Sequence, residues 1–196
     1  MTKRVWLFLA ITLWLGGIGA GLWKLWAYDN RPGVSAHAPD RWPDGTSLSR
    51  SSDGPTLLFV AHPQCTCTAA SLQELAEILA RAPHRPKTYV LFLKPVAVDD
   101  GWEQTDLWRT ARAIAGVTAV RDDDGVEAKR FDVATSGQTF LYDKSGALIF
   151  SGGITGSRAH AGENAGELAL ISLLTSGQAN QRASSVFGCP LFATAE

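Results

Sequence analysis

An uninterrupted apolar run near the N-terminus constrains this chain more than any other feature of its 196 residues. The stretch VWLFLAITLWLGGIGAGLW, from Val5 to Trp23, is 19 residues long, and Thr12 is its only polar member. A helix of about 20 apolar residues is what crosses the hydrocarbon core of a bilayer. The run therefore predicts one transmembrane helix, an N-terminal anchor within residues 1–28.

The charges beside this run predict how the anchor is oriented. Lys3 and Arg4 precede it, and basic flanks stay on the cytoplasmic side. We expect a single-pass membrane protein with a cytoplasmic N-terminus and the rest of the chain facing the periplasm or exterior. A cleaved signal peptide is the alternative, because AHA at residues 36–38 has the small-x-small form of a cleavage site. Its distance from the apolar run, and the length of that run, favour a retained anchor.

Composition divides the remainder of the chain. Residues 29–55 are crowded with Pro, Gly, Ser and Asp and have no apolar period, which predicts a flexible linker. Residues 56–196 then form one domain with a C-terminal tail. The 18 Lys and Arg are balanced by 19 Asp and Glu, so the chain lacks the excess of basic residues that is typical of nucleic-acid-binding proteins, and no nucleic-acid partner is expected.

Apolar patterns in the domain predict strands and helices in alternation. TLLFVA, at residues 56–61, is a continuous apolar run typical of a strand buried on both faces. Leu72, Leu75 and Leu79 recur at helical spacing. The predicted elements are strands at 56–61 and 88–93, helices at 69–81 and 105–116, a hairpin at 139–153, and a last helix that includes Leu168 and Leu174. This order predicts an α/β fold, a mixed sheet flanked by helices.

Two cysteines stand where the first strand gives way to a helix. AHPQCTCTAAS, residues 61–71, places Cys65 and Cys67 there. Free N–H groups and the helix dipole at a helix N-terminus stabilise negative charge, and the thiolate is the nucleophile of disulfide exchange. SLQE at 71–74 has the form of a capping box. If Ser71 is the cap, the thiols lie a turn away and gain less.

The third cysteine widens the choice of partners. Cys189 lies between Gly188 and Pro190 near the C-terminus. All three cysteines are expected on the outer side of the membrane, where disulfides form and persist. A Cys65–Cys67 bond closes a small ring with poor torsion. The sequence leaves all three pairings open.

Two segments resemble the thioredoxin-like superfamily, in particular its membrane-anchored TlpA and ResA branch. FVAHPQCTCTAASLQEL resembles the active-site segment of that family, and FDVATSGQTFLYDKSGALIF resembles its later strand and turn. The order H-P-x-C-x-C with a late F-G-C-P is similar to RedB-type members. The likeness covers Thr56 to about Leu174. It implies a thioredoxin-like fold and a thiol-disulfide oxidoreductase, without a cofactor, acting on extracytoplasmic protein thiols or disulfides.

The resemblance also assigns roles to residues. It implies that Cys65 is the nucleophile. The tail with Cys189 lies outside the likeness, and the open pairings leave either Cys67 or Cys189 to resolve the mixed disulfide. Thr68 occupies the place of the family's second cysteine, and Gly137 that of a cis-proline which helps to receive substrate. The residues expected to bind substrate or tune the thiols are His62, Pro63, Thr68 and Gly137.

Two other functions remain open at this point. One is a copper or other soft-metal chaperone, because Cys65, Cys67, Cys189 and His62 form a ligand set suited to Cu(I) or Zn(II). The other is a redox-inactive interaction domain. His62 is more typical of a loop histidine that lowers a thiol pKa as a cation than of a ligand. The polar loop that carries Arg158, His160, Glu163 and Asn164 is expected to cap the last helix, or to approach the thiols.

Overall fold

The computed structural model of the protein describes residues 2–192 and divides into two units, one ending at Arg31 and one beginning at Pro32. The first unit is the helix α1 (Thr2–Asp29). Its segment Lys3–Asp29, 27 residues long, is apolar enough to cross a membrane, and none of its apolar window is buried. A long apolar N-terminal helix is therefore confirmed, with the length and composition of a membrane anchor or a signal sequence.

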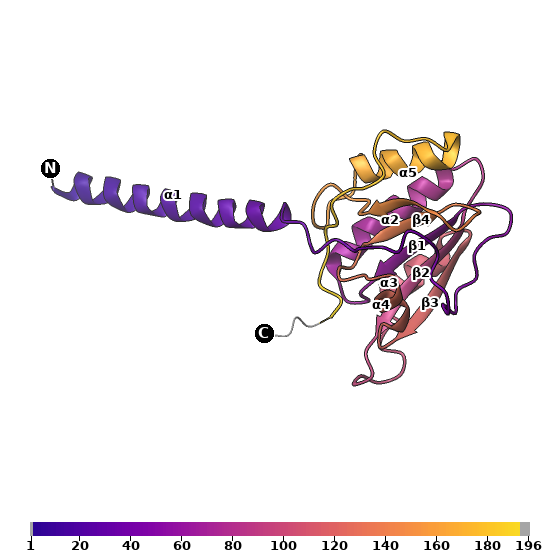
Figure 1. Cartoon of the computed structure of the whole chain (residues 1–196). Helices are drawn as coiled ribbons and strands as arrows, with labels where there is room; N and C mark the ends of the chain where they lie inside the picture. Colours follow the sequence, from indigo (N-terminus) through magenta and orange to yellow (C-terminus); the bar gives the residue numbers. More distant parts are fainter. Residues whose placement is uncertain (1, 193–196) are drawn as a thin grey trace. The chain divides into compact units, whose positions relative to one another are not determined.

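Within the described residues, the second unit is built on a five-stranded mixed sheet in the order β3-β2-β1-β4-β5 (Figure 1). The strands are β1 (Thr56–Ala61), β2 (Lys87–Lys94), β3 (Val117–Asp123), β4 (Thr139–Tyr142) and β5 (Leu148–Gly152). β1, β2 and β3 are parallel, whereas β4 is antiparallel to both β1 and β5. Every residue of the central strand β1 is buried, as its unbroken apolar run predicts.

Helices and connecting segments cover both faces of this sheet. The helices are α2 (Thr66–Arg81), α3 (Asp106–Ala113), α4 (Val126–Arg130) and α5 (Ala165–Ser176). Leu57 and Phe59 of β1 belong to a core shared with α2, α3 and α5. Leu58 and Val60 belong to a second core that includes α4. Alternate side chains of a strand point to opposite faces, so β1 anchors both cores. The predicted α/β fold with helices flanking a mixed sheet is confirmed.

One strand was missing from the predicted order. β3 is an edge strand, and of its seven residues only Asp122 is buried. Its sequence, VTAVRDD, is half polar, because an edge strand pairs on one side only and does not need the apolar run of a central strand. The polar stretch after it contains the short helix α4.

Residues 32–55, predicted as a flexible linker, lie against the domain. Trp42 packs edge-on against Phe131 and Tyr142, with ring centroids 5.2 Å apart in each case. Leu48 is 7% exposed, and the Ser47 N–H donates to Glu127 at 2.9 Å. The composition does not predict this packing, because the apolar residues that make it are isolated in the sequence and follow no helical or strand period.

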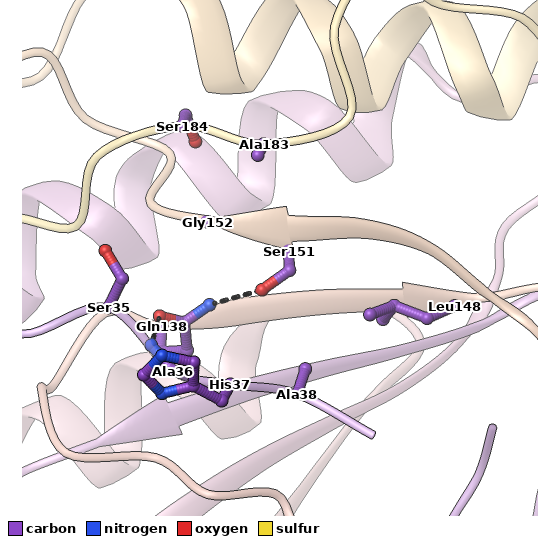
Figure 2. Close-up of a pocket in the computed structure, with 10 residues that line it drawn as sticks. All are labelled: Ser35, Ala36, His37, Ala38, Gln138, Leu148, Ser151, Gly152, Ala183 and Ser184. Atoms are coloured by element: carbon purple, nitrogen blue, oxygen red, sulfur yellow. Dashed lines mark hydrogen bonds between the residues drawn. The ribbon is translucent and has the colours of Figure 1, made fainter. Parts of the chain in front are cut away.

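The start of the same segment also forms one wall of a cavity of about 330 Å³ (Figure 2). Ala36 N–H donates to Gln138 Oε1 at 3.4 Å, and Gln138 Nε2 donates to Ser151 Oγ at 3.1 Å. Residues 183–184 lie on the far side of the cavity. The segment is therefore part of the domain from Pro32 onward, which leaves only residues 30–31 between α1 and the domain.

Candidate functional site

The first part of the site is the N-terminus of α2. Cys65 is the N-cap residue, with extended backbone angles (φ −86°, ψ 115°), and the helix begins at Thr66. Ser71 is therefore inside the helix, where its hydroxyl donates to the Cys67 carbonyl at 3.4 Å, and it is not the cap. Cys65 thus caps the helix and Cys67 lies in its first turn, both at the positive end of the helix dipole.

The second part of the site is the C-terminal tail, which runs antiparallel beside the loop before β4. Thr135 and Pro190 form a bridge. Ser136 N–H donates to the Cys189 carbonyl at 2.9 Å, and Leu191 N–H donates to the Ala134 carbonyl at 2.8 Å. These backbone bonds bring the tail across the start of α2 and place Cys189 against Cys65.

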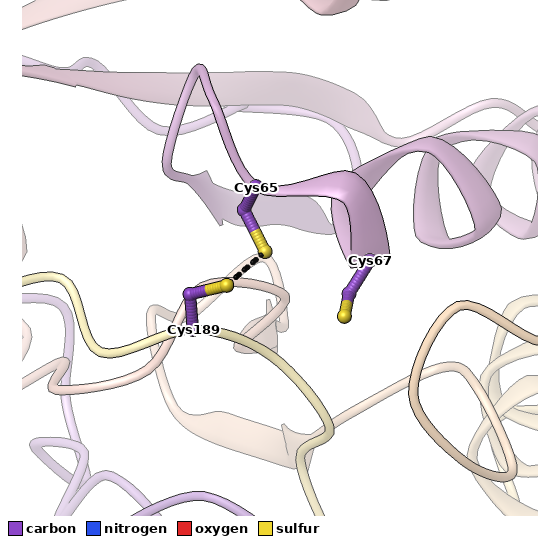
Figure 3. Close-up of side chains that lie close together, drawn as sticks. All are labelled: Cys65, Cys67 and Cys189. Atoms are coloured by element: carbon purple, nitrogen blue, oxygen red, sulfur yellow. Dashed lines mark hydrogen bonds between the residues drawn. The ribbon is translucent and has the colours of Figure 1, made fainter. Parts of the chain in front are cut away.

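The three cysteine sulfurs lie together although one is more than 120 residues from the others (Figure 3). Cys65 Sγ and Cys189 Sγ are 2.8 Å apart, and all three Sγ atoms lie within 4.8 Å of one another. The Cys67 thiol stands to one side of the Cys65–Cys189 contact. Cys65 is 2% exposed and Cys67 7% exposed, whereas Cys189 is more accessible.

The surroundings of the three thiols give them different acidities. Burial acts to raise the pKa of Cys65, but hydrogen bonds from the Cys189 thiol and N–H, the Thr68 hydroxyl and the Cys67 N–H outweigh it, so this pKa lies below its ordinary value. Burial and the neighbouring Cys65 raise the pKa of Cys67. Burial and the hydrogen bond to Cys65 raise the pKa of Cys189 to about 12. Cys65 is therefore the thiol that ionises first.

A chain of buried hydroxyls leads to the Cys65 sulfur. His62 N–H donates to Ser136 Oγ at 2.9 Å, and Ser136 Oγ lies 2.9 Å from Thr68 Oγ1. The Thr68 hydroxyl in turn bonds the Cys65 side chain. Thr68 and Ser136 are each 1% exposed. With Ser136 donating to Thr68, every hydroxyl proton in the chain points towards Cys65.

His62 has a different place from the one that its sequence position suggests. Its Nδ1 accepts the Gln64 N–H at 3.2 Å, and its ring meets Trp102 edge-on at 5.5 Å. Burial lowers the pKa of His62, so the ring is neutral near pH 7 and does not supply the expected cation. In the described part of the chain, the metal-ligand grouping at this site consists of the three sulfurs without His62.

Pro63 and Gly137 shape the loops that hold the site. Pro63 is buried, and its carbonyl accepts the Thr105 hydroxyl at 2.9 Å, which ties the cysteine loop to the start of α3. Gly137 has a φ of +91°, and its N–H donates to the Val60 carbonyl at 2.8 Å. Proline has neither the N–H nor a positive φ, so the proline of the resembled family is incompatible with this backbone.

The cation near the thiols is Arg158, from the polar loop that was expected to cap the last helix or to approach the thiols. Its guanidinium donates to the Gly188 carbonyl and hydrogen-bonds the Cys67 side chain. Its charge acts to lower the pKa of Cys67 and of Cys189, against the larger effect of burial. The rest of this loop behaves as a helix cap: Asn164 accepts the N–H groups at the start of α5. Arg158 thus approaches the thiols, one of the two roles expected of its loop, whereas Ser136 is a site residue that the sequence did not indicate.

Replacing Thr68 with valine is expected to raise the pKa of Cys65. The thiolate loses one donor, and because the thiolate fraction at a given pH falls as the pKa rises, alkylation of Cys65 at pH 7 should slow by about threefold to tenfold. The measurement is the rate of iodoacetamide labelling against pH, with Cys65 followed by peptide mapping. Thr68→Ser keeps the hydroxyl and should leave the profile in place; an unchanged profile in Thr68→Val would contradict the assigned bond.

Comparison with known proteins identifies the fold and nothing finer. No family profile and no curated protein matches this chain. An uncharacterized conserved protein from Geobacillus kaustophilus superposes with a TM-score of 0.58 at 16% identity, over 85% of this chain and 94% of its own. A hypothetical protein from Sinorhizobium meliloti gives 0.53 at 18% identity, over 85% and 96%. The N-terminal domain of PilB from Neisseria gonorrhoeae gives 0.44 at 16%, over 66% and 81%. The chain therefore shares its α/β fold with the first two of these proteins.

Proposed function

We propose that the protein is a membrane-anchored, extracytoplasmic thiol-disulfide oxidoreductase whose redox pair is Cys65 and Cys189. The observation that carries the proposal is the 2.8 Å contact between their sulfurs at the N-terminus of α2. A helix N-terminus, a lowered thiol pKa and a facing second thiol are the conditions under which a cysteine exchanges disulfides near neutral pH.

Cys189 is a better partner for Cys65 than Cys67 is. Cys65 and Cys67 are only two residues apart at the start of α2, so a bond between them would close a small ring with poor torsion. Cys189 approaches from a separate segment, and its sulfur already faces Cys65. Cys67 remains as a neighbouring thiol with a raised pKa.

The apolar helix α1 supports the membrane part of the proposal. It is long enough to span a bilayer, and the Lys3 and Arg4 flank favours a cytoplasmic N-terminus. The domain then faces the periplasm or exterior, where an oxidising environment allows the pair to cycle. Its partners there are protein thiols or disulfides.

The test is intact mass and peptide mapping of full-length protein from an oxidising compartment, alkylated before and after mild reduction. We expect a reversible Cys65–Cys189 disulfide that reforms with an added disulfide donor. A reversible Cys65–Cys67 bond instead would keep the oxidoreductase but reassign its pair.

A second candidate is a soft-metal chaperone, which the mutual approach of three sulfurs within 4.8 Å favours. Three thiolates suit Cu(I) or Zn(II). The same experiment separates it: three free thiols in both states, with stoichiometric copper or zinc in the native sample, would replace the redox proposal with this one. Free thiols without metal would leave an interaction domain.

A further inference from the structure

We infer that, once Cys65 and Cys189 are joined, an incoming protein thiol attacks Cys189 and expels Cys65, so that the protein donates its disulfide to substrate dithiols. The inference rests on the proposed redox pair. It reverses the role that the family resemblance gives to Cys65, which becomes the leaving sulfur. Access to the two sulfurs, the support of the leaving thiolate and the position of Arg158 each point in this direction.

Access distinguishes the two sulfurs. Disulfide exchange requires the attacking thiolate to reach the sulfur along the bond that breaks. Cys65 is 2% exposed, while Cys189 is partly exposed and is followed by the exposed Pro190. The residues on either side of Cys189, Gly188 and Pro190, line a cavity of about 290 Å³ together with Arg158. A target therefore meets Cys189 first.

The two sulfurs also differ in how well each one leaves as a thiolate. A sulfur leaves faster when its thiolate is more stable. Cys65 leaves into the N-terminus of α2, where the Cys67 N–H and the Thr68 hydroxyl bond its sulfur. The thiol of Cys189 lies on an extended tail and has a pKa of about 12. Attack on Cys189 expels the better leaving group, whereas attack on Cys65 expels the poorer one.

Charge favours the same encounter. Arg158 acts electrostatically on Cys189 and holds the carbonyl of Gly188, the residue before it. An attacking thiolate is an anion, so this guanidinium raises its local concentration beside Cys189. Among the described residues, the titratable groups that act most on the Cys189 thiol are Cys65, Cys67 and Arg158, and Arg158 is the cation among them.

The reaction balances as two displacements. The target thiolate forms a bond to Cys189 Sγ, the Cys65–Cys189 bond breaks, and its electron pair goes to Cys65 as thiolate. The second target thiolate then attacks the target sulfur of the mixed disulfide and expels the Cys189 thiolate, which takes up a proton. The target loses two electrons and the protein gains two. A disulfide donor such as oxidised glutathione restores the Cys65–Cys189 bond.

The direction of electron flow follows from the same contacts. The hydrogen bonds to the Cys65 thiolate exist only in the reduced protein, and interactions that stabilise the reduced form make a disulfide more oxidising. A thiolate at a helix N-terminus adds to this preference. The oxidised protein is therefore a disulfide donor, and reduced protein dithiols are its substrate class.

The experiment uses oxidised full-length protein in detergent, mixed with excess reduced glutathione and quenched with acid at early times. Peptide mapping should find the first glutathione adduct on Cys189, at least about tenfold over Cys65, with Cys65 free. The Cys67→Ser variant should give the same map, which excludes a thiol shuffle through Cys67. An early adduct on Cys65 would overturn the inference.

A second arm tests the direction. A synthetic peptide with two cysteines should be converted to its disulfide, one equivalent per oxidised protein; a peptide that remains reduced would also overturn the inference. Failure of the proposed function is seen separately. In that case no Cys65–Cys189 bond forms before glutathione is added, whereas a formed bond with the adduct on Cys65 refutes only the order of attack.

Discussion

Replacing Cys65 with serine is expected to lower the rate of disulfide exchange by at least about a thousandfold. Cys65 is the sulfur that both other thiols meet: it contacts Cys189 at 2.8 Å, and it hydrogen-bonds Cys67. A serine hydroxyl fills the same place but neither ionises near neutral pH nor forms a disulfide. The measurement is oxidation of a dithiol peptide by full-length protein in the presence of oxidised glutathione.

The other two cysteines provide matched controls for this result. Cys67→Ser should keep the rate within about threefold, because the Cys65–Cys189 pair remains. Cys189→Ser should lose turnover yet keep Cys65, which then accumulates as a stable mixed disulfide. Full activity in Cys65→Ser would contradict the assignment of the site, and a loss in Cys67→Ser equal to that in Cys65→Ser would move the pair to Cys65 and Cys67.

The sequence predicts the fold well where periodicity and burial coincide. The apolar run of β1 and the leucine stripe of α2 consist of buried residues whose spacing in the sequence matches the period of a strand or a helix, so the local pattern identifies both elements. The strand β3 was not predicted, because an edge strand does not need an apolar run. The packing of residues 32–55 against the domain was not predicted, because a few widely separated side chains, Trp42 and Leu48 among them, hold the segment there.

The site shows a sharper limit. Position after a buried strand was enough to mark Cys65 and Cys67 as chemical candidates. Nothing local places Cys189, because its position depends on backbone bonds between the tail and residues 134–136, more than 50 residues away in the chain. The capping-box pattern at Ser71 even suggested a later helix start, since the extended backbone of Cys65 that caps α2 has no side-chain signature.

The glycine before Cys189 gives the second large expected effect. A Cβ atom at position 188 would lie 1.8 Å from the Ser136 carbonyl oxygen, a contact with backbone that no rotamer change relieves. Gly188→Ala should therefore lift the tail from residues 134–136 and draw Cys189 away from Cys65. Cys65, now 2% exposed beneath the tail, should be alkylated at least about tenfold faster in the reduced protein. Overpacking of this kind also costs about 1–3 kcal/mol of stability.

Gly156→Ala is the matched control for that variant. Gly156 lies in the exposed loop that carries Arg158, and a Cβ there meets only the Asn164 Cβ at 3.7 Å, an ordinary contact. This variant should leave the alkylation rate and the disulfide unchanged. Peptide mapping after timed alkylation measures both effects, and the yield of the Cys65–Cys189 disulfide should fall only in Gly188→Ala. Gly188 affects Cys65 through the position of the tail. Slow alkylation of Cys65 together with a full Cys65–Cys189 disulfide yield in Gly188→Ala would therefore show that the tail does not control access to the Cys65 thiol.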